Sequence, residues 1–193
     1  MIVNILFAGV GGQGIVTASD LVADAAVRAG WAVKKAETHG MAQRGGSVVS
    51  HVRMADSGTV YSPLIPEGKA DFLVALELLE GVRALPWLAP EGKVIADARR
   101  LDPASVALGA VAYPPDLEEA LRQRGIVVRA TEHAAKLGEP RAANALLLGV
   151  LSRSLRIDNT TWRAAFAGCL KPSVVDINWQ AFELGQTLAE GGF

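Results

Sequence analysis

Residues 2–20 read IVNILFAGVGGQGIVTASD, and this stretch decides the fold. The apolar run over 2–10 predicts a buried strand, and the glycines after it lead into a helix over 15–29 whose apolar residues recur at helical spacing. Gly30 ends that helix, and residues 32–36 predict a second strand. A strand–helix–strand unit of this kind implies parallel strands and a right-handed crossover. The chain therefore opens as a Rossmann-like fold.

The rest of the chain predicts more strands followed by a helical end. Residues 48–54 and 59–61 predict an antiparallel hairpin around the turn Asp56-Ser57-Gly58. Further strands are expected over 72–76, 94–96, 106–112 and 126–131. Helices are expected between the strands at 72–76 and 94–96, where Pro86 helps to end the helix, and over 116–124, 141–153, 161–170 (capped by Asn159 and Thr160) and 174–188.

The expected fold class is therefore α/β, with three layers and a Rossmann-like, mostly parallel sheet. A local antiparallel hairpin and a helical C-terminal part complete it. We expect one domain over residues 1–193, because the sequence contains no linker rich in Pro, Gly or Ser and no repeat.

Composition limits the classes of function. The net charge of -1 gives no broad attraction for nucleic acid or an anionic membrane. The apolar runs fall far short of the roughly 18 residues that a membrane span needs. Met1 to Val10 lacks the marks of a secretion signal, so a cytoplasmic location is expected. Cys169 is the only cysteine, so the chain can form neither an internal disulfide nor a four-thiolate iron–sulfur cluster.

The segment Gly9-Val10-Gly11-Gly12-Gln13-Gly14 fits the pattern G-x-G-x-x-G between a strand and a helix. Its backbone N–H groups and the helix N-terminus suit a pyrophosphate, although the same glycines also serve a tight turn without any ligand. In a dinucleotide fold an acidic residue about 20 positions further on binds the ribose, and Glu37 is roughly placed for this. These features alone favour a nicotinamide or flavin enzyme.

The segment that follows Glu37 departs from ordinary dinucleotide binding, because residues 38–47 combine His39, Arg44 and three glycines in one loop. Arg44 can pair bidentately with a phosphate or carboxylate, while Gly45 and Gly46 allow close approach of the backbone. His39 and His51 lack the spacing and the companions of a metal site, so no metal is expected. No serine lies in a nucleophile elbow, so hydrolysis is not supported.

Together these segments resemble the gamma-type subunit of the 2-oxoacid:ferredoxin oxidoreductases. The resemblance rests on Gly9-Val10-Gly11-Gly12-Gln13-Gly14-Ile15, on Glu37-Thr38-His39-Gly40-Met41-Ala42-Gln43-Arg44-Gly45-Gly46-Ser47-Val48, and on Ser62-Pro63-Leu64-Ile65. The form of the second segment resembles the small (beta) subunit of the indolepyruvate branch. The similarity extends over most of the chain, and residues 99–137 are its least diagnostic part.

The resemblance implies a subunit of a thiamine diphosphate-dependent enzyme that is inactive alone. Such enzymes convert an aryl 2-oxoacid such as indolepyruvate, with coenzyme A and oxidised ferredoxin, to acyl-CoA, carbon dioxide and reduced ferredoxin. Thiamine diphosphate and the iron–sulfur clusters would reside on a larger partner subunit, through which ferredoxin is reached. This chain would cover the active site and help to bind coenzyme A.

No catalytic residue is assigned from the sequence. The glycine loop over 9–14 and Arg44 are expected to contact phosphate, whereas His39 and Gln43 are expected nearer the interface with the partner. The residues expected to contact the cofactor are Gly9, Gly11, Gly12, Gln13, Gly14, His39, Gln43, Arg44, Gly45 and Gly46.

Two other functions remain open at this point. The glycine motif and Glu37 also suit a self-sufficient NAD(P)-binding Rossmann oxidoreductase, although no catalytic pair is evident. Alternatively the chain is an assembly subunit that binds no ligand, and its glycines serve close packing against the partner.

Overall fold

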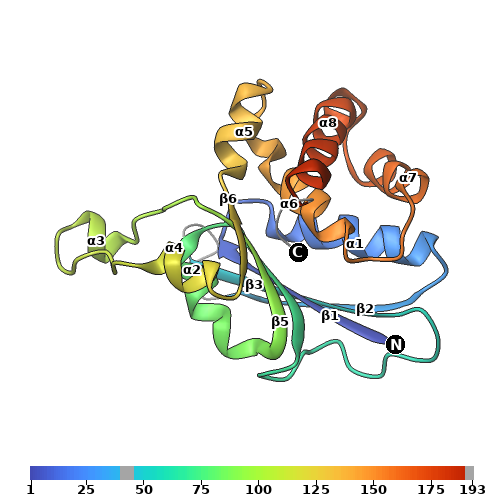
Figure 1. Cartoon of the computed structure of the whole chain (residues 1–193), viewed down its shortest axis with the longest axis horizontal. Coiled ribbons are helices and arrows are strands. Elements are labelled where there is room, and N and C mark those ends of the chain that lie inside the picture. The colour runs from blue at the N-terminus through green and yellow to red at the C-terminus, as the bar shows by residue number, and fades with distance from the viewer. Residues whose placement is uncertain (40–45, 190–193) are drawn as a thin grey trace.

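The computed structural model describes residues 1–39 and 46–189 (Figure 1). The strands of the described part are β1 (Ile2–Val10), β2 (Ala32–His39), β3 (Ser47–Ala55), β4 (Ala70–Ala75), β5 (Leu88–Asp97) and β6 (Gly125–Val128). Its helices are α1 (Ile15–Arg28), α2 (Leu78–Ala84), α3 (Ala104–Ala107), α4 (Leu117–Arg122), α5 (Ala130–Lys136), α6 (Ala143–Ser152), α7 (Asn159–Cys169) and α8 (Pro172–Ala189), with 3-10 turns at Leu85–Trp87 and Pro140–Ala142.

The strands form one sheet in the order β2-β3-β1-β4-β5-β6. Strands β1, β4, β5 and β6 run parallel to one another, while β3 runs antiparallel to both of its neighbours, β1 and β2. The α/β class and the mostly parallel sheet are therefore confirmed. Strand β2 does run in the same direction as β1, but β3 lies between them, which the sequence pattern did not indicate.

The predicted hairpin is wrong in its second strand. Residues 59–61 form no strand, and β3 pairs instead with β1 along its whole length, from Ile2 opposite Ala55 to Val10 opposite Ser47. The antiparallel character is confirmed, but it comes from the insertion of β3 between β1 and the edge strand β2. Burial favours this pairing: Val52 and Met54 are fully buried there, whereas in the predicted second strand only Val60 is buried and Tyr61 is 87% exposed.

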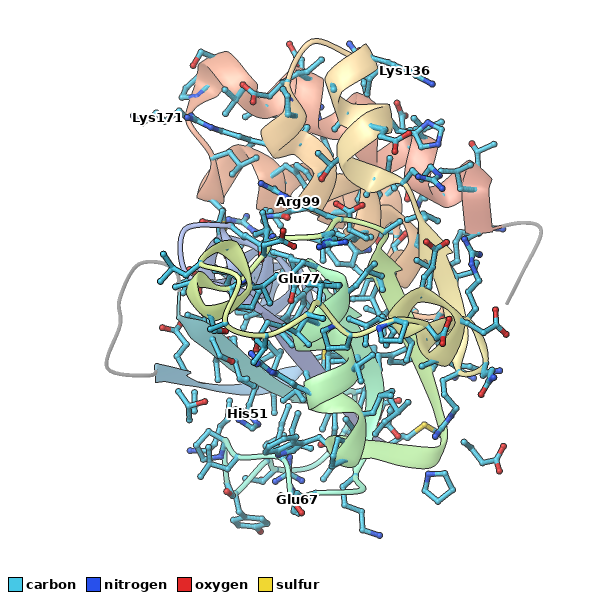
Figure 2. The ribbon with its side chains drawn as sticks, turned by 90° about the vertical axis from the view of Figure 1, so that its left-hand side faces the viewer. His51, Glu67, Glu77, Arg99, Lys136 and Lys171 are labelled. Carbon is cyan, nitrogen blue, oxygen red and sulfur yellow. The ribbon has the colours of Figure 1, made fainter. Side chains whose placement is uncertain are left out.

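The two faces of the sheet are covered by different helices, which gives the three layers. Because side chains alternate along a strand, Ile5 and Phe7 of β1 pack against one group of helices and Leu6 and Ala8 against the other. Helices α1 and α5 to α8 lie on the first side, and α2 and α4 on the second (Figure 1). In the view turned by 90°, Lys136 and Lys171 mark the first layer at the top (Figure 2).

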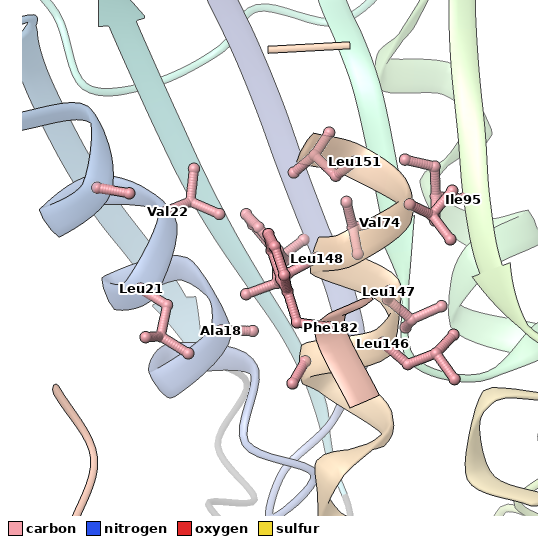
Figure 3. Packing of buried hydrophobic residues seen from close by; sticks show 14 of the residues in the cluster. Ala18, Leu21, Val22, Val74, Ile95, Leu146, Leu147, Leu148, Leu151 and Phe182 are labelled. Carbon is pink, nitrogen blue, oxygen red and sulfur yellow. The ribbon is translucent and has the colours of Figure 1, made fainter. Parts of the chain in front are cut away.

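The larger core lies under α6, which is buried nearly all round. Figure 3 shows Leu146, Leu147, Leu148 and Leu151 of this helix packed among residues of α1, β4 and β5. All four leucines are at most 1% exposed. Burying one leucine stabilises a fold by about 2 kcal/mol, so α6 anchors the C-terminal layer on the sheet. No helix of the described residues is long and apolar enough to cross a membrane.

Several element boundaries differ from the prediction. Residues 106–112 form no strand: the first two end the short helix α3 and the others follow it, in an arm that extends from the body of the molecule (Figure 1). Leu108 is 84% exposed there, so its apolar character has no neighbouring strand to pack against. The last strand stops at Val128, and α5 takes over two residues later. The cap of α7 is Asp158, whose carboxylate accepts from the Thr161 N–H at 2.8 Å.

Helices α6 and α8 cross in backbone contact at two glycines. A Cβ added to Gly149 would lie 2.0 Å from the Phe182 carbonyl oxygen, and one added to Gly185 would lie 2.0 Å from that of Leu146. Backbone atoms cannot move aside as a flexible side chain can. Both positions therefore require glycine for the helices to approach this closely.

Replacing Gly185 with alanine should force the two helices apart. We expect Gly185→Ala to lower the free energy of unfolding by about 2 kcal/mol, a typical cost of overpacking, despite the better helix propensity of alanine. The matched control is Gly168→Ala in α7, where a new Cβ would meet side-chain ends and no backbone, the nearest being the Arg28 guanidinium at 2.8 Å. That variant should be neutral or slightly stabilised. Urea unfolding measures both, and equal stabilities of the two variants would contradict the requirement for glycine at the crossing.

Candidate functional site

The glycine loop joins the end of β1 to the start of α1. Gly12 and Gly14 have φ angles of 100° and 83°, a left-handed conformation that glycine adopts without strain. The Gly11 N–H donates to the Gly46 carbonyl oxygen at 2.8 Å, which places the end of the second glycine segment beside the first. No described residue accepts a hydrogen bond from the backbone N–H groups of Gly12, Gly14 or Ile15. These amides are therefore available to an anion at the positive end of α1.

Gln13 uses its side chain within the protein. Its Oε1 accepts from the Val10 N–H at 2.6 Å, and its Nε2 donates to the Leu76 carbonyl oxygen at 3.0 Å. The amide thus connects the carboxyl end of β1 to the residue that follows β4. Its side-chain amide is therefore engaged in hydrogen bonds within the protein. From the sequence, a contact of Gln13 with the cofactor was expected.

Asn144, near the start of α6, reaches the loop from the helical layer. Its Nδ2 donates to the Gln13 carbonyl oxygen at 2.8 Å and lies 3.3 Å from that of Gly14. This residue was not among those predicted from the sequence. The available signal was its spacing: Arg141 and Asn144 are three residues apart around the start of a helix, so their side chains lie near one another.

Two hollows flank the loop at the carboxyl ends of the parallel strands, where α/β folds bind ligands. They have volumes of about 380 and 270 Å³. The larger lies between the start of α1 and the C-terminal helices, and the smaller lies over the ends of β4 and β5. Both are lined by Gly12, Gln13, Arg141 and Asn144. One elongated ligand could therefore contact both hollows across the loop.

Positive side chains line these hollows. Arg141 borders both, Lys171 borders the larger and Arg99 the smaller. Within residues 1–39 and 46–189, none of the three forms an ion pair. In Figure 2, Arg99 lies where the carboxyl end of the sheet meets the C-terminal helices, and Lys171 lies further out on the helical layer. The hollows therefore combine unpaired cations with free backbone amides, which suits a phosphate-bearing anion.

The predicted site residues separate into three groups. Gly9, Gly11, Gly12, Gln13, Gly14 and Gly46 gather at the loop. His39 ends β2, which β3 separates from β1. Gln43, Arg44 and Gly45 lie outside the described residues.

Glu37 is not placed as a dinucleotide fold requires. That role needs the second strand to lie next to the first, so that the acidic residue stands beside the glycine loop. Here β3 intervenes, and the Glu37 carboxylate pairs with Lys35 at 2.6 Å. Lys35 also pairs with Asp20, so this lysine is engaged within the protein.

His51 has a structural role. It is 5% exposed in β3, and its Nδ1 accepts from the Ile65 N–H at 3.3 Å. Burial lowers the pKa of its imidazole, which favours the neutral form. Among the described residues, no group of three His, Cys, Asp or Glu side chains could hold a metal ion.

Asp97 brings a buried carboxylate to the smaller hollow at the end of β5. It is 3% exposed and accepts hydrogen bonds from the backbone N–H and the hydroxyl of Thr131. Burial raises the pKa of the Asp97 carboxyl above its ordinary value of 3.8, although the bonds from Thr131 and the charge of Arg99 act in the opposite direction. The folded protein therefore retains a proton that the unfolded chain releases at the same pH.

Because the pKa of Asp97 is raised, we expect the free energy of unfolding to fall as the pH rises. The proton bound by Asp97 stabilises the folded state. This contribution to the free energy of unfolding is complete below pH 3.8, and it is lost as the pH rises through the folded-state pKa of Asp97. Asp97→Asn, which keeps an acceptor for Thr131, should therefore gain stability relative to the parent chain across this interval. Urea unfolding at several pH values measures the difference, with Asp176→Asn at an exposed carboxylate as the control. A difference independent of pH would contradict the expectation.

Known proteins resemble this chain over nearly its whole length. The family model described as pyruvate ferredoxin/flavodoxin oxidoreductase matches residues 4–188. The chain is 42% identical to the indolepyruvate oxidoreductase subunit IorB of Archaeoglobus fulgidus and 35% identical to that of Thermococcus kodakarensis. The first alignment covers 100% of this chain and 98% of the relative, and the second covers 97% and 96%.

Two solved structures share the fold. The gamma subunit of a keto/oxoacid ferredoxin oxidoreductase from Geobacter sulfurreducens superposes with a TM-score of 0.71 at 22% identity, over 97% of this chain and 98% of that one. The 2-oxoglutarate:ferredoxin oxidoreductase of Magnetococcus marinus, solved with 2-oxoglutarate, coenzyme A and succinyl-CoA, gives 0.75 at 22% identity. That match covers 98% of this chain but only 31% of the longer one. With its family model matched over nearly the whole length, this chain belongs to the pyruvate ferredoxin/flavodoxin oxidoreductase family.

Proposed function

We propose that this chain is the small subunit of an indolepyruvate-type 2-oxoacid:ferredoxin oxidoreductase and holds coenzyme A against a larger partner. The observation that carries the proposal is the glycine loop with its free amides, placed between two hollows that unpaired arginines line. The relatives at 34–42% identity bear the name of that small subunit. The reaction would convert an aryl 2-oxoacid, coenzyme A and oxidised ferredoxin to acyl-CoA, carbon dioxide and reduced ferredoxin.

The residues of the hollows fit the phosphates of coenzyme A. The diphosphate would accept hydrogen bonds from the amides of Gly12, Gly14 and Ile15 at the start of α1. Arg141 would pair with the same group, and Arg99 and Lys171 would reach the ends of the ligand, since they border different hollows. The larger hollow, at about 380 Å³, falls in the usual range for small-molecule sites.

The mechanism divides the work between two chains. Thiamine diphosphate on the partner would supply the nucleophilic carbon that cleaves the oxoacid, and the partner's iron–sulfur clusters would take the electrons to ferredoxin. This chain would orient the coenzyme A thiol and exclude water from the reacting centre, so that transfer to the thiol outcompetes hydrolysis. A lone cysteine, Cys169, is consistent with leaving electron transfer to the partner.

The proposal also includes four residues of the second glycine segment: His39, Gln43, Arg44 and Gly45. Arg44 and Gly45 would add phosphate contacts beside Gly46, whose carbonyl oxygen already bonds the Gly11 N–H. His39 and Gln43 would lie nearer the partner. In this arrangement residues 1–193 act as a single gamma-type domain.

The nicotinamide alternative loses its main support in this fold, because β3 displaces β2 and its Glu37 from the side of the glycine loop. Titration of the chain with NADH, followed by fluorescence, tests it directly. An assembly subunit without a ligand remains the second candidate, and the kinetic test below distinguishes it from coenzyme A binding.

Removing the cations at the loop should weaken coenzyme A binding specifically. In the reconstituted two-subunit complex, we expect Arg141→Ala and Arg44→Ala each to raise the KM for coenzyme A by about 10- to 100-fold, the usual worth of a charge-assisted hydrogen bond. The KM for the oxoacid should change little. Steady-state kinetics with each substrate varied in turn measures both.

The matched control is Arg122→Ala, which removes an arginine paired with Glu118 on the distant surface of α4. It should leave the coenzyme A dependence unchanged. If Arg141→Ala and Arg44→Ala both behave like this control, the chain does not bind the phosphates of coenzyme A and the assembly role is favoured.

A further inference from the structure

Two side-chain amides hold the glycine loop from opposite sides. Gln13 bonds the loop to the ends of β1 and β4, and Asn144 bonds it to the start of α6. Neither amide belongs to the cation set that would pair with a phosphate. Their bonds all go to backbone groups, which indicates a role in setting the shape of the loop.

The bonds from Asn144 fix the direction of two peptide groups. Every described peptide bond is trans, and in a trans peptide the C=O and the following N–H point in opposite directions. Holding the Gln13 carbonyl therefore aims the Gly14 N–H, and holding the Gly14 carbonyl aims the Ile15 N–H. These are two of the amides that have no acceptor among the described residues. The Gly14 carbonyl also accepts from the Ala18 N–H at 2.9 Å, so the Ile15 N–H of the same peptide points along the axis of α1.

The glycines of the motif make room for the same two amides. A Cβ added to Gly14 would lie 2.8 Å from the Asn144 Nδ2, and one added to Gly9 would lie 2.7 Å from the Gln13 Oε1. Both distances are shorter than real Cβ contacts. Two positions of the G-x-G-x-x-G pattern thus keep space for the side chains that hold the loop, in addition to allowing a ligand to approach.

The start of α6 connects the loop to the rest of the site. Arg141 precedes this helix by two residues and Asn144 lies in its first turn, so one short segment supplies both a cation and the bond to the loop. Because α6 is packed against α8 and the sheet, this segment is rigid. The position of the Asn144 amide at the loop is therefore set by the C-terminal layer and not by the loop alone.

We propose that Asn144 and Gln13 are positioning residues that orient the glycine-loop amides toward the phosphates of coenzyme A. Asn144 links this orientation to the C-terminal helices. This inference rests on the proposed function for the identity of the ligand. The geometry of the loop itself is independent of it. The two parts are therefore tested by different measurements.

The kinetic measurement uses the reconstituted complex. Asn144→Ala should raise the KM for coenzyme A about tenfold, while kcat and the KM for the oxoacid change less than about twofold. Asn144→Leu, which fills the space but donates no hydrogen bond, should do the same and covers the case in which the alanine variant folds poorly. Asn159→Ala is the matched control, because Asn159 bonds Gln186 on α8, far along the chain from the loop. Equal increases in both KM values, or a KM for coenzyme A like that of the control, would overturn the positioning role.

The geometric measurement needs no ligand. Residual dipolar couplings of the Gly14 and Ile15 N–H bonds report their direction in the full chain by NMR. In Asn144→Ala and Gln13→Ala the Gly14 coupling should fall by about half or more as that bond loses a fixed direction. The Ile15 coupling should change less, because the Ala18 N–H still holds the Gly14 carbonyl, and those of β4 and α4 should remain. Unchanged couplings would overturn the inference whatever the kinetics show. If Arg141→Ala and Arg44→Ala leave coenzyme A kinetics unchanged while the couplings fall, the proposed ligand is wrong and the control of the loop by Asn144 stands.

Discussion

Burial of β1 on both of its faces is the constraint on which the rest of the structure depends. Its residues from Ile5 to Ala8 are at most 1% exposed, with α1 against one side and α2 against the other. A strand covered twice cannot slip in register without moving apolar side chains out of both cores. The glycine loop that leaves its carboxyl end is therefore held at one place, and both hollows form around it.

The site is assembled from segments far apart in the sequence. The loop comes from the first strand and helix, Asp97 and Arg99 from the end of β5, and Arg141 and Asn144 from the start of α6. Each contributes a different chemical group: free amides, a buried carboxylate, cations, and a side-chain amide that orients the loop. The helical layer thus takes part in the site, because the rigid crossing of α6 and α8 fixes where Arg141 and Asn144 stand.

The insertion of β3 separates this fold from a dinucleotide-binding domain that has a similar opening. The glycine motif is compatible with both, since each leaves backbone amides at a helix N-terminus free to bind an anion. The ribose contact is not compatible with this fold, because it requires the second strand to lie next to the first. A single antiparallel strand between β1 and β2 therefore separates Glu37 from the loop.

The sequence by itself determined most of the local elements and marked the glycine loop. Apolar periodicity predicted β1, α1 and the helical end correctly, because burial on a sheet and on a helix leaves different spacings. The glycine loop was also evident, because its left-handed residues tolerate few alternatives to glycine. The pattern over 106–112 misled the prediction, because apolar residues in an exposed arm have the same spacing as a short strand.

Only the tertiary structure decided which strands are neighbours and which side chains meet at the loop. Strand order depends on long-range pairing, and the turn after β3 gave no sign that β3 would enter between β1 and β2. The contact of Asn144 with Gln13 joins residues 131 positions apart, a distance over which local pattern carries no information. The same is true of Gln13: the sequence marked it as part of a ligand loop, and the fold shows its side chain holding that loop to the strands.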